Sequence, residues 1–385
     1  MRKYKRVFII ILDSFGIGYQ PDAERFGDAG ANTLFRIFRS ESFNIPTLLS
    51  LGFGNIDGCE FLGGTDTPLA TVARLREVSA GKDTTVGHFE LMGAVSEKPF
   101  PTYPAGFPDE IIAEFSKRCG RRVLCNRPYS GTEVIRDYGD MHRESGDFIV
   151  YTSQDSVFQI AAHEEVVSLE ELYSACKTAR EILVGENGVA RVIARPFIGE
   201  SGKYVRTANR RDFSIKPPHG TALDAIKESG REVIAVGKIN DIFAGEGITE
   251  SIISHSNREG MEITESLLDR DFSGLCFTNL VEFDSHYGHR QDVDGYAEAI
   301  SEFDAWLQRF IEKLAEDDLL MITADHGCDP GDDSTDHTRE YVPLFILGSG
   351  IIPENLGTLI GFYSVGKTAA QALGAEYKGP GEVLV

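Results

Sequence analysis

Leu319-Leu-Met-Ile-Thr-Ala-Asp-His-Gly327 is a run of apolar, strand-favouring residues that ends in an acid, an imidazole and a glycine. A near-continuous apolar strand of this kind is typical of a sheet covered on both faces. Two other segments have the same design: Val7–Leu12 ends at Asp13, and Leu275–Val281 is followed by Asp284. In open α/β sheets, ligands bind at the carboxyl ends of the strands. The chain is therefore predicted to carry its chemistry at that edge.

The rest of this α/β region follows the same alternation of strands and helices. Val233–Val236 and Val342–Leu347 are further apolar runs. Between two strands, residues 292–317 carry apolar side chains at helical spacing, which makes a βαβ unit. We expect an α/β core with a mostly parallel sheet flanked by helices.

A second domain is predicted between two clusters of proline. The first cluster begins at Pro99 and the second is Pro217 and Pro218, and such clusters are typical of domain boundaries. Between them, Ser168 followed by Glu171 marks the start of a helix running to Leu183. Strands are expected at 148–152 and 191–197. We predict a discontinuous core, 1–99 with 217–385, and an inserted α+β domain, 100–216.

Composition excludes several classes of protein. The 385 residues include 38 Lys and Arg against 60 Asp and Glu, a net charge of −22, which argues against nucleic-acid binding by phosphate neutralisation. The apolar run 7–12 is too short to span a membrane or to serve as a signal peptide. Six scattered cysteines without a CxxC pair favour reduced thiols. We expect a cytoplasmic protein.

Three aspartates and three histidines follow the predicted strand ends and are expected to meet at one rim. They are Asp13, Asp284, His289, Asp325, His326 and His337. Six ligands exceed the needs of one tetrahedral ion but divide naturally between two ions. Taken singly, each residue is equally well explained as a helix cap or a loop residue. The mixed oxygen and nitrogen donors allow Mn²⁺, Mg²⁺, Fe²⁺ or Zn²⁺ and favour Mn²⁺.

A candidate nucleophile lies in the segment Gly81–His88, which contains Thr84 and Thr85. A threonine hydroxyl is a weak nucleophile, and coordination to a metal ion is one way to activate it. Without a metal site nearby, the same segment would be only a polar turn.

These residues resemble the phosphopentomutases, a family of the alkaline phosphatase superfamily, over nearly the whole chain. The Asp-His-Gly motif alone is shared widely, and the full set in this order is specific. The matching stretches are Ile11-Leu-Asp-Ser-Phe-Gly-Ile-Gly18, Gly81-Lys-Asp-Thr84, Tyr151-Thr-Ser-Gln-Asp-Ser156, Gly237-Lys238, Phe283-Asp-Ser-His-Tyr-Gly-His-Arg290, Thr323-Ala-Asp-His-Gly327 and Thr335-Asp-His-Thr-Arg-Glu340.

The resemblance implies an alkaline-phosphatase-like core with an inserted cap and two Mn²⁺ ions. One ion would be held by Asp284, His289 and His337, and the other by Asp13, Asp325 and His326. The family's phosphorylated threonine follows a Lys-Asp pair, which makes it Thr84, with Thr85 as second choice. Thr84 is also an expected metal ligand. Glucose 1,6-bisphosphate or ribose 1,5-bisphosphate is the implied activator.

The insert of this acidic chain carries a basic cluster, consisting of Arg191, Arg195, Arg206, Arg210 and Arg211. Guanidinium groups bind phosphate in bidentate fashion, although a solvated basic face would look the same in sequence. The resemblance implies a set of substrate-binding residues: Ser153, Asp155, Val157, Arg191, Ile193, Arg206, Arg210 and Lys238.

The implied activity is interconversion of the 1-phosphates and 5-phosphates of ribose and deoxyribose through a phosphothreonine. A metal-dependent phosphatase or phosphodiesterase would use the same residues but admit water, and a phosphoglycerate mutase is expected to use serine. A P-loop nucleotide-binding protein is a different class, because Gly361-Phe-Tyr-Ser-Val-Gly-Lys-Thr368 fits GxxxxGK[ST]. We expect Ser364 to be a helix N-cap there instead. A non-catalytic metal-binding protein would leave Thr84 and the arginines unexplained.

Overall fold

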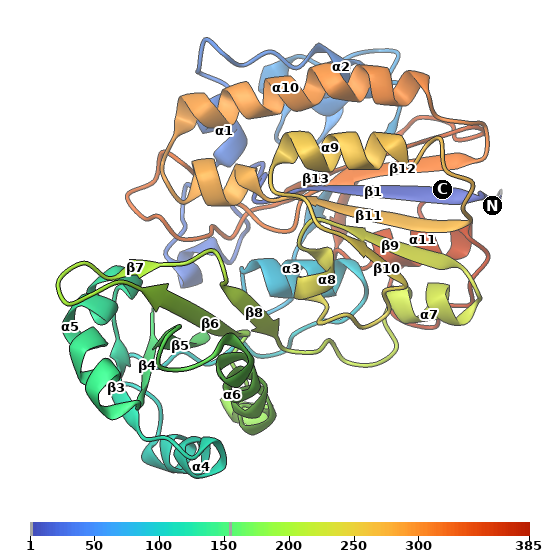
Figure 1. Cartoon of the computed structure of the whole chain (residues 1–385). Coiled ribbons are helices and arrows are strands. Elements are labelled where there is room, and N and C mark those ends of the chain that lie inside the picture. Colours follow the sequence, from blue (N-terminus) through green and yellow to red (C-terminus); the bar gives the residue numbers. More distant parts are fainter. Residues whose placement is uncertain (1–2, 154–155) are drawn as a thin grey trace. The chain divides into compact units, whose positions relative to one another are not determined.

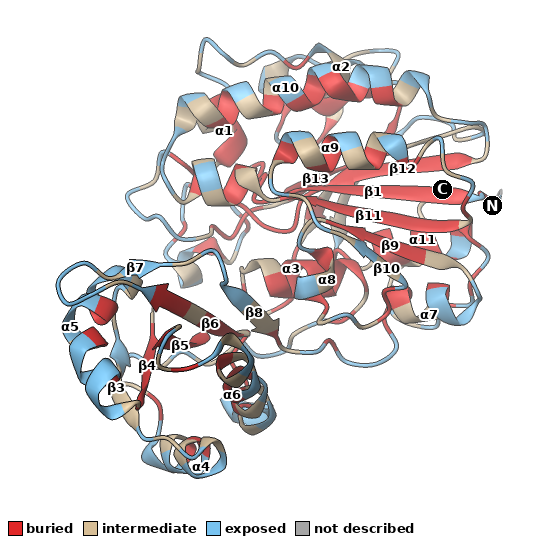
Figure 2. Cartoon of the chain, in the orientation of Figure 1, coloured by how far each residue is buried: buried red, intermediate tan, exposed pale blue. Residues whose placement is uncertain are grey.

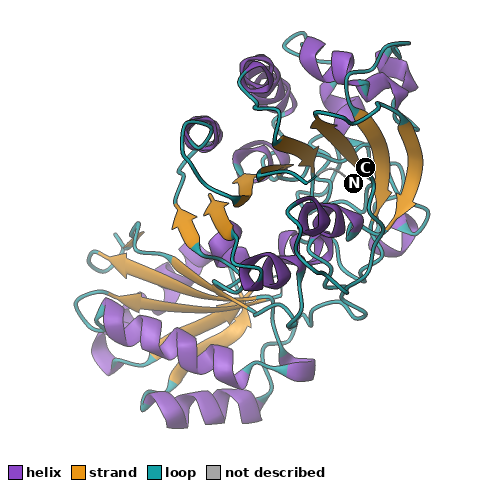
Figure 3. Ribbon diagram, turned by 90° about the vertical axis from the view of Figure 1, so that its right-hand side faces the viewer, coloured by secondary structure: helices purple, strands orange, loops and turns teal. Residues whose placement is uncertain are grey.

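The computed structural model describes residues 3–153 and 156–385 (Figure 1). The chain divides into two compact units. One consists of Met1–Lys98 and Pro217–Val385, and the other is Pro99–Lys216. Each unit has its own sheet, with helices packed against it (Figure 3).

The first unit is built on an eight-stranded sheet in which most pairs are parallel. The pairs β12 with β13 and β13 with β2 are antiparallel. This arrangement confirms the predicted α/β class with a mostly parallel sheet. In sheet order, the strands are β10 (Glu250–Ile252), β9 (Glu232–Val236), β11 (Gly274–Leu280), β1 (Arg6–Leu12), β12 (Asp318–Thr323), β13 (Val342–Gly348), β2 (Thr71–Arg76) and β14 (Asn355–Ile360).

Helices cover both faces of this sheet, as the near-continuous apolar strands require. Figure 1 shows α9 (Asn257–Ser266) and α10 (Val293–Glu312) on one face. The helical pattern predicted over 292–317 thus ends at Glu312, and a turn leads into β12. The opposite face carries α3 (Thr84–Leu91), α7 (Ala222–Glu228), α8 (Ile239–Ile242) and α11 (Ser364–Ala372), and the short helices α1 (Thr33–Ile37) and α2 (Pro46–Leu51) complete the unit.

The central strands form a rigid platform. Every residue of β1, β11 and β12 is buried, and Figure 2 shows these strands as continuous buried ribbons. Burying a large aliphatic side chain contributes about 1.5–3 kcal/mol relative to exposure. Residues that follow directly from these strands therefore have well-fixed backbone positions.

The second unit is an α+β module, as predicted. Its sheet has the order β3 (Val123–Pro128), β4 (Phe148–Thr152), β5 (Val157–His163), β6 (Arg191–Ile198) and β7 (Val205–Arg206), and β8 (Arg211–Ser214) also pairs with β6. One hydrophobic cluster joins the sheet to α4 (Asp109–Cys119) and α6 (Leu169–Ile182), and another joins it to α5 (Gly131–Ser145). The helix start predicted at Ser168 is confirmed. Ser168 is the N-cap residue of α6, and its hydroxyl accepts a hydrogen bond from the Glu171 amide.

The P-loop-like segment folds as an ordinary strand-to-helix connection. The prediction that Ser364 is the N-cap is wrong by one position, because α11 begins at Ser364 and Tyr363 is the N-cap. The Ser364 hydroxyl instead accepts from the Glu382 amide. The Lys367 ammonium donates to the carbonyls of Tyr377 and Gly379, at 2.7 and 3.2 Å, so it is committed to the C-terminal segment. These contacts argue against a phosphate-binding role for Lys367.

Within residues 3–153 and 156–385, no helix combines the length and apolar character needed to cross a bilayer.

Candidate metal and nucleophile site

The sheet register places three acidic residues side by side. β1 pairs in parallel with β11 and β12, so that Leu12 lies beside Leu280 and Ile11 beside Thr323. Asp13 follows β1 directly, and Asp325 follows β12. Asp284 lies in a π-helical turn, Phe283–Gly288, just after β11. All six predicted ligands come from segments that follow strands at this edge.

Asp13, Asp325 and His326 form one potential ligand group. Their ligand atoms all lie within 4.8 Å of one another, and all three side chains are buried. His326 Nε2 lies 3.5 Å from Asp13 Oδ1 and 3.2 Å from Asp325 Oδ2. This is the predicted second ligand set, brought together from two strands.

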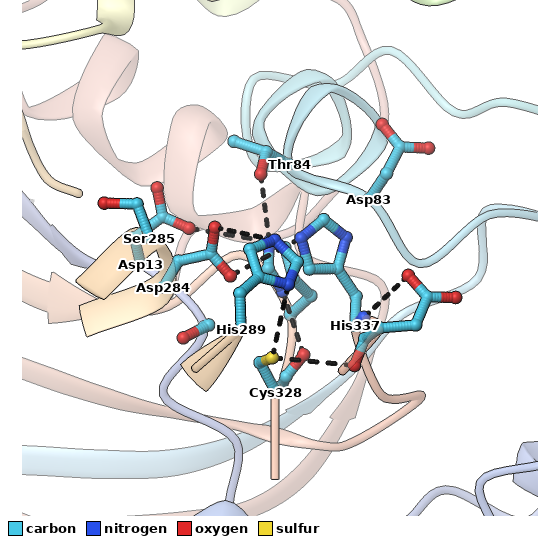
Figure 4. A network of polar contacts seen from close by, with 12 residues as sticks. Asp13, Asp83, Thr84, Asp284, Ser285, His289, Cys328 and His337 are labelled. Atoms are coloured by element: carbon cyan, nitrogen blue, oxygen red, sulfur yellow. Dashed lines mark hydrogen bonds and ion pairs between the residues drawn. The ribbon is translucent and has the colours of Figure 1, made fainter. Parts of the chain in front are cut away.

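Asp284 is the centre of the other group. Its Oδ2 lies 3.3 Å from His289 Nε2 and its Oδ1 lies 3.4 Å from His337 Nε2. The His337 ring lies between its neighbours, with centroids 4.0 Å from His326 and 4.7 Å from His289. Figure 4 shows the labelled carboxylates and imidazoles of Asp13, Asp284, His289 and His337 gathered around one centre.

The grouping differs in detail from the two predicted sets. Asp284 also forms a group with His326 and His337, so that His326 lies near both sets. A third group contains Asp284, His289 and Cys328, and the Cys328 sulfur lies 4.0 Å from His289 Nδ1. Sequence reasoning missed Cys328, although it directly follows the Asp-His-Gly motif.

Unpaired buried atoms show that these residues fit a metal ion. Asp13 Oδ1, Asp284 Oδ1, Asp325 Oδ2 and His337 Nε2 are buried and have no hydrogen-bond partner among the described residues. A buried polar atom without a partner costs free energy, and a cation would satisfy all four. With oxygen and nitrogen donors in the majority, the set suits a hard or borderline divalent ion.

The charges in the cluster oppose one another. Burial, together with the charges of Asp325 and Asp284, raises the pKa of Asp13 to about 7. Burial also disfavours ionised Asp325, but His326 and His88 hold the pKa of Asp325 below its usual range. The pKa of Asp284 is likewise lowered by His337 and His289 despite burial. The buried carboxylates therefore need a nearby positive charge to stay ionised, and divalent ions would supply it.

Thr84 faces this cluster from the first turn of α3. Asp83 caps the helix, because its carboxylate accepts from the amides of Thr85 and Val86. The Thr84 hydroxyl oxygen lies 3.1 Å from His326 Nε2, and Figure 4 shows it pointing toward the imidazoles. The neighbouring Thr85 is buried and holds Asp83 through its amide. Geometry therefore favours Thr84 over Thr85 as the nucleophile.

Glu340 fixes the loop that carries His337, and sequence reasoning missed it. Its Oε2 accepts from the amides of Gly18 and Thr33, at 2.9 and 3.0 Å. Its Oε1 lies 2.7 Å from the hydroxyls of both Thr33 and Thr338. Complete burial raises the pKa of Glu340 from 4.5 to about 7, and these hydrogen bonds lower it only in part. The only signal in the sequence was its place inside the Thr335–Glu340 motif.

The Glu340→Gln variant should lose a specific pH dependence of stability. The folded protein binds a proton at Glu340 more tightly than the unfolded chain, so this group lowers the free energy of unfolding as pH rises from 4.5 to 7. The cost is about 3 kcal/mol at pH 8. Glutamine carries no charge, and the threonine hydroxyls can accept from its amide. Urea unfolding of both proteins at pH 5 and pH 8 measures the difference, and parallel pH profiles would contradict the prediction.

The predicted substrate residues of the second unit lie on neighbouring strands. Val157 and Arg191 are register partners at the starts of β5 and β6, and Ile193 lies two residues further along β6. Val157 and Ile193 are buried. Ser153 follows β4, and Asp155 lies outside the described residues.

The arginines of this unit do not all serve one purpose. Arg210 makes a two-pronged contact with Asp212, at 2.8 and 2.7 Å, and Arg191 lies 3.7 Å from the same carboxylate. Arg206 is exposed on β7, whereas Arg211 packs over the rings of Tyr173 and Phe213.

Half-buried Arg195 and buried Tyr151 are further polar residues of that unit. Arg195 donates to Gln159 at 3.1 Å. The hydroxyl of buried Tyr151 has no hydrogen-bond partner among the residues that the structure describes, and burial raises its pKa although nearby arginines oppose the shift. Sequence reasoning had not singled out Tyr151.

Lys238 belongs to the first unit. It follows β9 and is the N-cap residue of α8, at the same carboxyl edge of the sheet as the ligand cluster.

Comparison with known proteins identifies relatives along the whole chain. The model of the metalloenzyme superfamily matches residues 5–377. The phosphopentomutase of Lachnoclostridium phytofermentans is 57% identical over 364 residues, covering 94% of this chain and 93% of the relative. That of Clostridioides difficile is 51% identical, with 97% of this chain and 99% of the relative covered.

Solved structures share the fold at low identity. Leishmania mexicana phosphoglycerate mutase aligns with a TM-score of 0.51 and 14% identity, covering 100% of this chain and 98% of that one. A protein from Pyrococcus horikoshii gives the same TM-score and identity over 99% and 100% of the two chains. The match supports the predicted alkaline-phosphatase-like fold.

Proposed function

The chain belongs to the phosphopentomutases of the metalloenzyme superfamily, and from that premise we propose that it interconverts ribose 1-phosphate and ribose 5-phosphate, and their deoxyribose counterparts, through phosphorylated Thr84. The observation that carries the proposal is the Thr84 hydroxyl, which lies 3.1 Å from His326 Nε2 and faces a cluster of buried ligand atoms that have no hydrogen-bond partner in the described part of the chain. A phosphatase would use the same hydroxyl and the same cluster, and the two functions differ in whether water reaches the phosphoryl group.

The enzyme is proposed to hold two Mn²⁺ ions with the six predicted ligands and Thr84. Asp284, His289 and His337 would hold one, and Asp13, Asp325 and His326 the other, with His326 close to both sets. When bound, the ions supply charge stabilisation for the phosphoryl group and for the attacking and leaving oxygens. The protein's own part is to fix these ligands on buried strand ends.

Phosphoryl transfer in this scheme passes through a sugar bisphosphate. The bond between Thr84 Oγ1 and phosphorus breaks, and a bond forms from the free sugar hydroxyl oxygen to phosphorus. The hydroxyl proton ends on Thr84 Oγ1. The original phosphate of the bisphosphate then returns to Thr84 by the reverse exchange, so the sugar must reorient between the two steps.

The second unit is proposed to hold the phosphate that is not being transferred. Arg191, Arg206 and Arg210 carry the guanidinium groups, and Ser153, Asp155, Val157 and Ile193 of the same unit would contact the sugar. Lys238 of the first unit is proposed separately as a substrate-binding residue. Planar guanidinium groups bind phosphate with two hydrogen bonds. The Tyr151 hydroxyl has no hydrogen-bond partner among the described residues, and the charges of Arg195, Arg206 and Arg210 act on it, which supports an anion at this place.

Loss of the phosphoryl group to water would inactivate the enzyme until it is rephosphorylated. Glucose 1,6-bisphosphate or ribose 1,5-bisphosphate is the proposed activator for that reason. Exclusion of water is what separates this mutase from a phosphatase with the same ligands. The cytoplasm is the proposed compartment, and the six free cysteines support it.

A product assay tests this function. Purified protein with Mn²⁺ and catalytic glucose 1,6-bisphosphate is given ribose 1-phosphate, and ribose 5-phosphate and inorganic phosphate are both measured. We expect ribose 5-phosphate to be the main product and its formation to depend on the bisphosphate. Inorganic phosphate as the main product would instead establish a phosphatase.

A further inference from the structure

One buried side chain joins the nucleophile to the ligand cluster. His88 lies on α3, one helical turn after Thr84, and its side chain has no exposed surface. His88 Nδ1 lies 2.8 Å from the Thr84 carbonyl oxygen and 3.1 Å from Asp325 Oδ2. The same ring nitrogen therefore contacts the backbone of the nucleophile and a carboxylate of the cluster.

Asn279 fixes the tautomer of His88. The Asn279 amide nitrogen lies 2.8 Å from Asp13 Oδ2 and 3.4 Å from His88 Nε2. The amide NH₂ has two protons, so it can donate to both acceptors, and His88 Nε2 must then carry no proton. The Thr84 carbonyl, which only accepts, requires the proton on Nδ1. The partners of both ring nitrogens therefore indicate the same tautomer, in which His88 donates from Nδ1.

A close backbone approach supports the same connection. A Cβ atom on Gly87 would overlap the carbonyl oxygen of Asp325. Glycine at this position therefore lets α3 lie directly on the backbone that carries Asp325. His88 and Gly87 act at one place, where the nucleophile helix meets the ligand loop after β12.

We propose that His88 is a positioning residue for phosphoryl transfer, which donates its Nδ1–H to the Thr84 carbonyl in a tautomer set by Asn279 and keeps Thr84 beside the Asp325 carboxylate, against which the same ring edge lies. The proposal rests on Thr84 being the nucleophile. His88 is buried and lies behind Thr84, so it acts on the reaction through Thr84 and Asp325.

Three substitutions at His88 separate its two ring nitrogens. In His88→Asn the amide nitrogen takes the place of Nδ1, in His88→Gln the amide takes the place of Nε2, and His88→Phe keeps only the volume. At saturating Mn²⁺ we expect kcat to fall about 10- to 100-fold in His88→Phe, the usual effect of losing a partner behind a metal ligand, with KM unchanged. His88→Asn should retain more kcat than His88→Gln. Phosphorylation of Thr84 by glucose 1,6-bisphosphate, followed by intact mass, should likewise be slower in His88→Gln than in His88→Asn, and slower in His88→Phe than in the parent.

Two further variants keep the test decisive. Gly87→Ala keeps the His88 side chain but forces α3, and His88 with it, away from Asp325. It should show the same loss of kcat without a change in KM. Thr84→Ala is assayed in parallel: activity in that variant would refute the proposed function itself. If Thr84→Ala is inactive, then full kcat in His88→Phe or Gly87→Ala, or His88→Gln outperforming His88→Asn, overturns the positioning role alone. Losses of kcat that follow only the melting temperature would also overturn it.

Discussion

Thr84→Ala is expected to abolish mutase turnover. The Thr84 hydroxyl, 3.1 Å from His326 Nε2, is the oxygen that would carry the phosphoryl group between the two positions of the sugar. Alanine has no oxygen to be phosphorylated, and water cannot replace it because a phosphoryl group lost to water is not returned. We expect kcat to fall by a factor on the order of 10⁴ or more, the scale seen when a covalent nucleophile is removed. Ribose 5-phosphate formation from ribose 1-phosphate measures the loss.

Thr85→Ala is the matched control, since it removes the same atoms from the adjacent residue. The contact recorded between Thr85 and Asp83 is made by the backbone amide, which alanine retains. The α3 cap should therefore persist, with turnover within about threefold of the parent, because a single lost hydroxyl interaction contributes about 0.5–1.5 kcal/mol at most to stability. Intact mass and peptide mapping after treatment with glucose 1,6-bisphosphate should place one phosphoryl group on Thr84. Phosphate on Thr85, or an active Thr84→Ala enzyme, would reassign the nucleophile.

The place of the site could be predicted because strand ends are visible in sequence. Asp13 and Asp325 each follow an apolar run that is buried throughout, and the parallel register sets those runs side by side. The apolar pattern thus locates the carboxyl ends of the strands, and the residues that follow those ends are the candidate ligands. The division of the six side chains between two ligand groups could not be predicted. His326 lies near both Asp284 and Asp13, and that position depends on the course of the loops, which the sequence pattern does not define.

The roles of His88, Asn279 and Glu340 could not be predicted from the sequence, for a different reason. Nearly all of α3 is buried, so it has no polar face to give a helical period, and the turn of helix that aligns His88 with Thr84 could not be recognised. Asn279 lies inside a mostly apolar strand, where a single amide gives no pattern. Glu340 acts through residues distant in the chain, namely Gly18 in a loop and Thr33 at the start of α1. Such roles follow from side-chain direction, which only the folded chain defines.

Removal of divalent metal should abolish turnover and destabilise the first unit. The atoms Asp13 Oδ1, Asp284 Oδ1, Asp325 Oδ2 and His337 Nε2 are buried and lack a hydrogen-bond partner within the described part of the chain. A ligand that binds only the folded state at about 1,000 times its Kd contributes about 4 kcal/mol to stability. Chelation should therefore lower the melting temperature as well as activity. Thermal unfolding and product formation are measured after chelation and after adding back Mn²⁺, Mg²⁺ or Zn²⁺ singly, and we expect Mn²⁺ to restore both most fully.

Asp13→Asn distinguishes a bound cation from a merely structural cluster. Burial and the charges of Asp325 and Asp284 raise the pKa of Asp13 to about 7, so at pH 8 the metal-free protein carries an ionised carboxylate at a free-energy cost. Asparagine removes that charge, and its side-chain oxygen can still accept from Asn279, which lies 2.8 Å from Asp13 Oδ2. The metal-free variant should thus be at least as stable as the metal-free parent, yet gain far less stability from Mn²⁺ and show little turnover. Equal stabilisation of both proteins by Mn²⁺ would place the ion elsewhere, and full turnover in the variant would show that Asp13 is not needed to hold it.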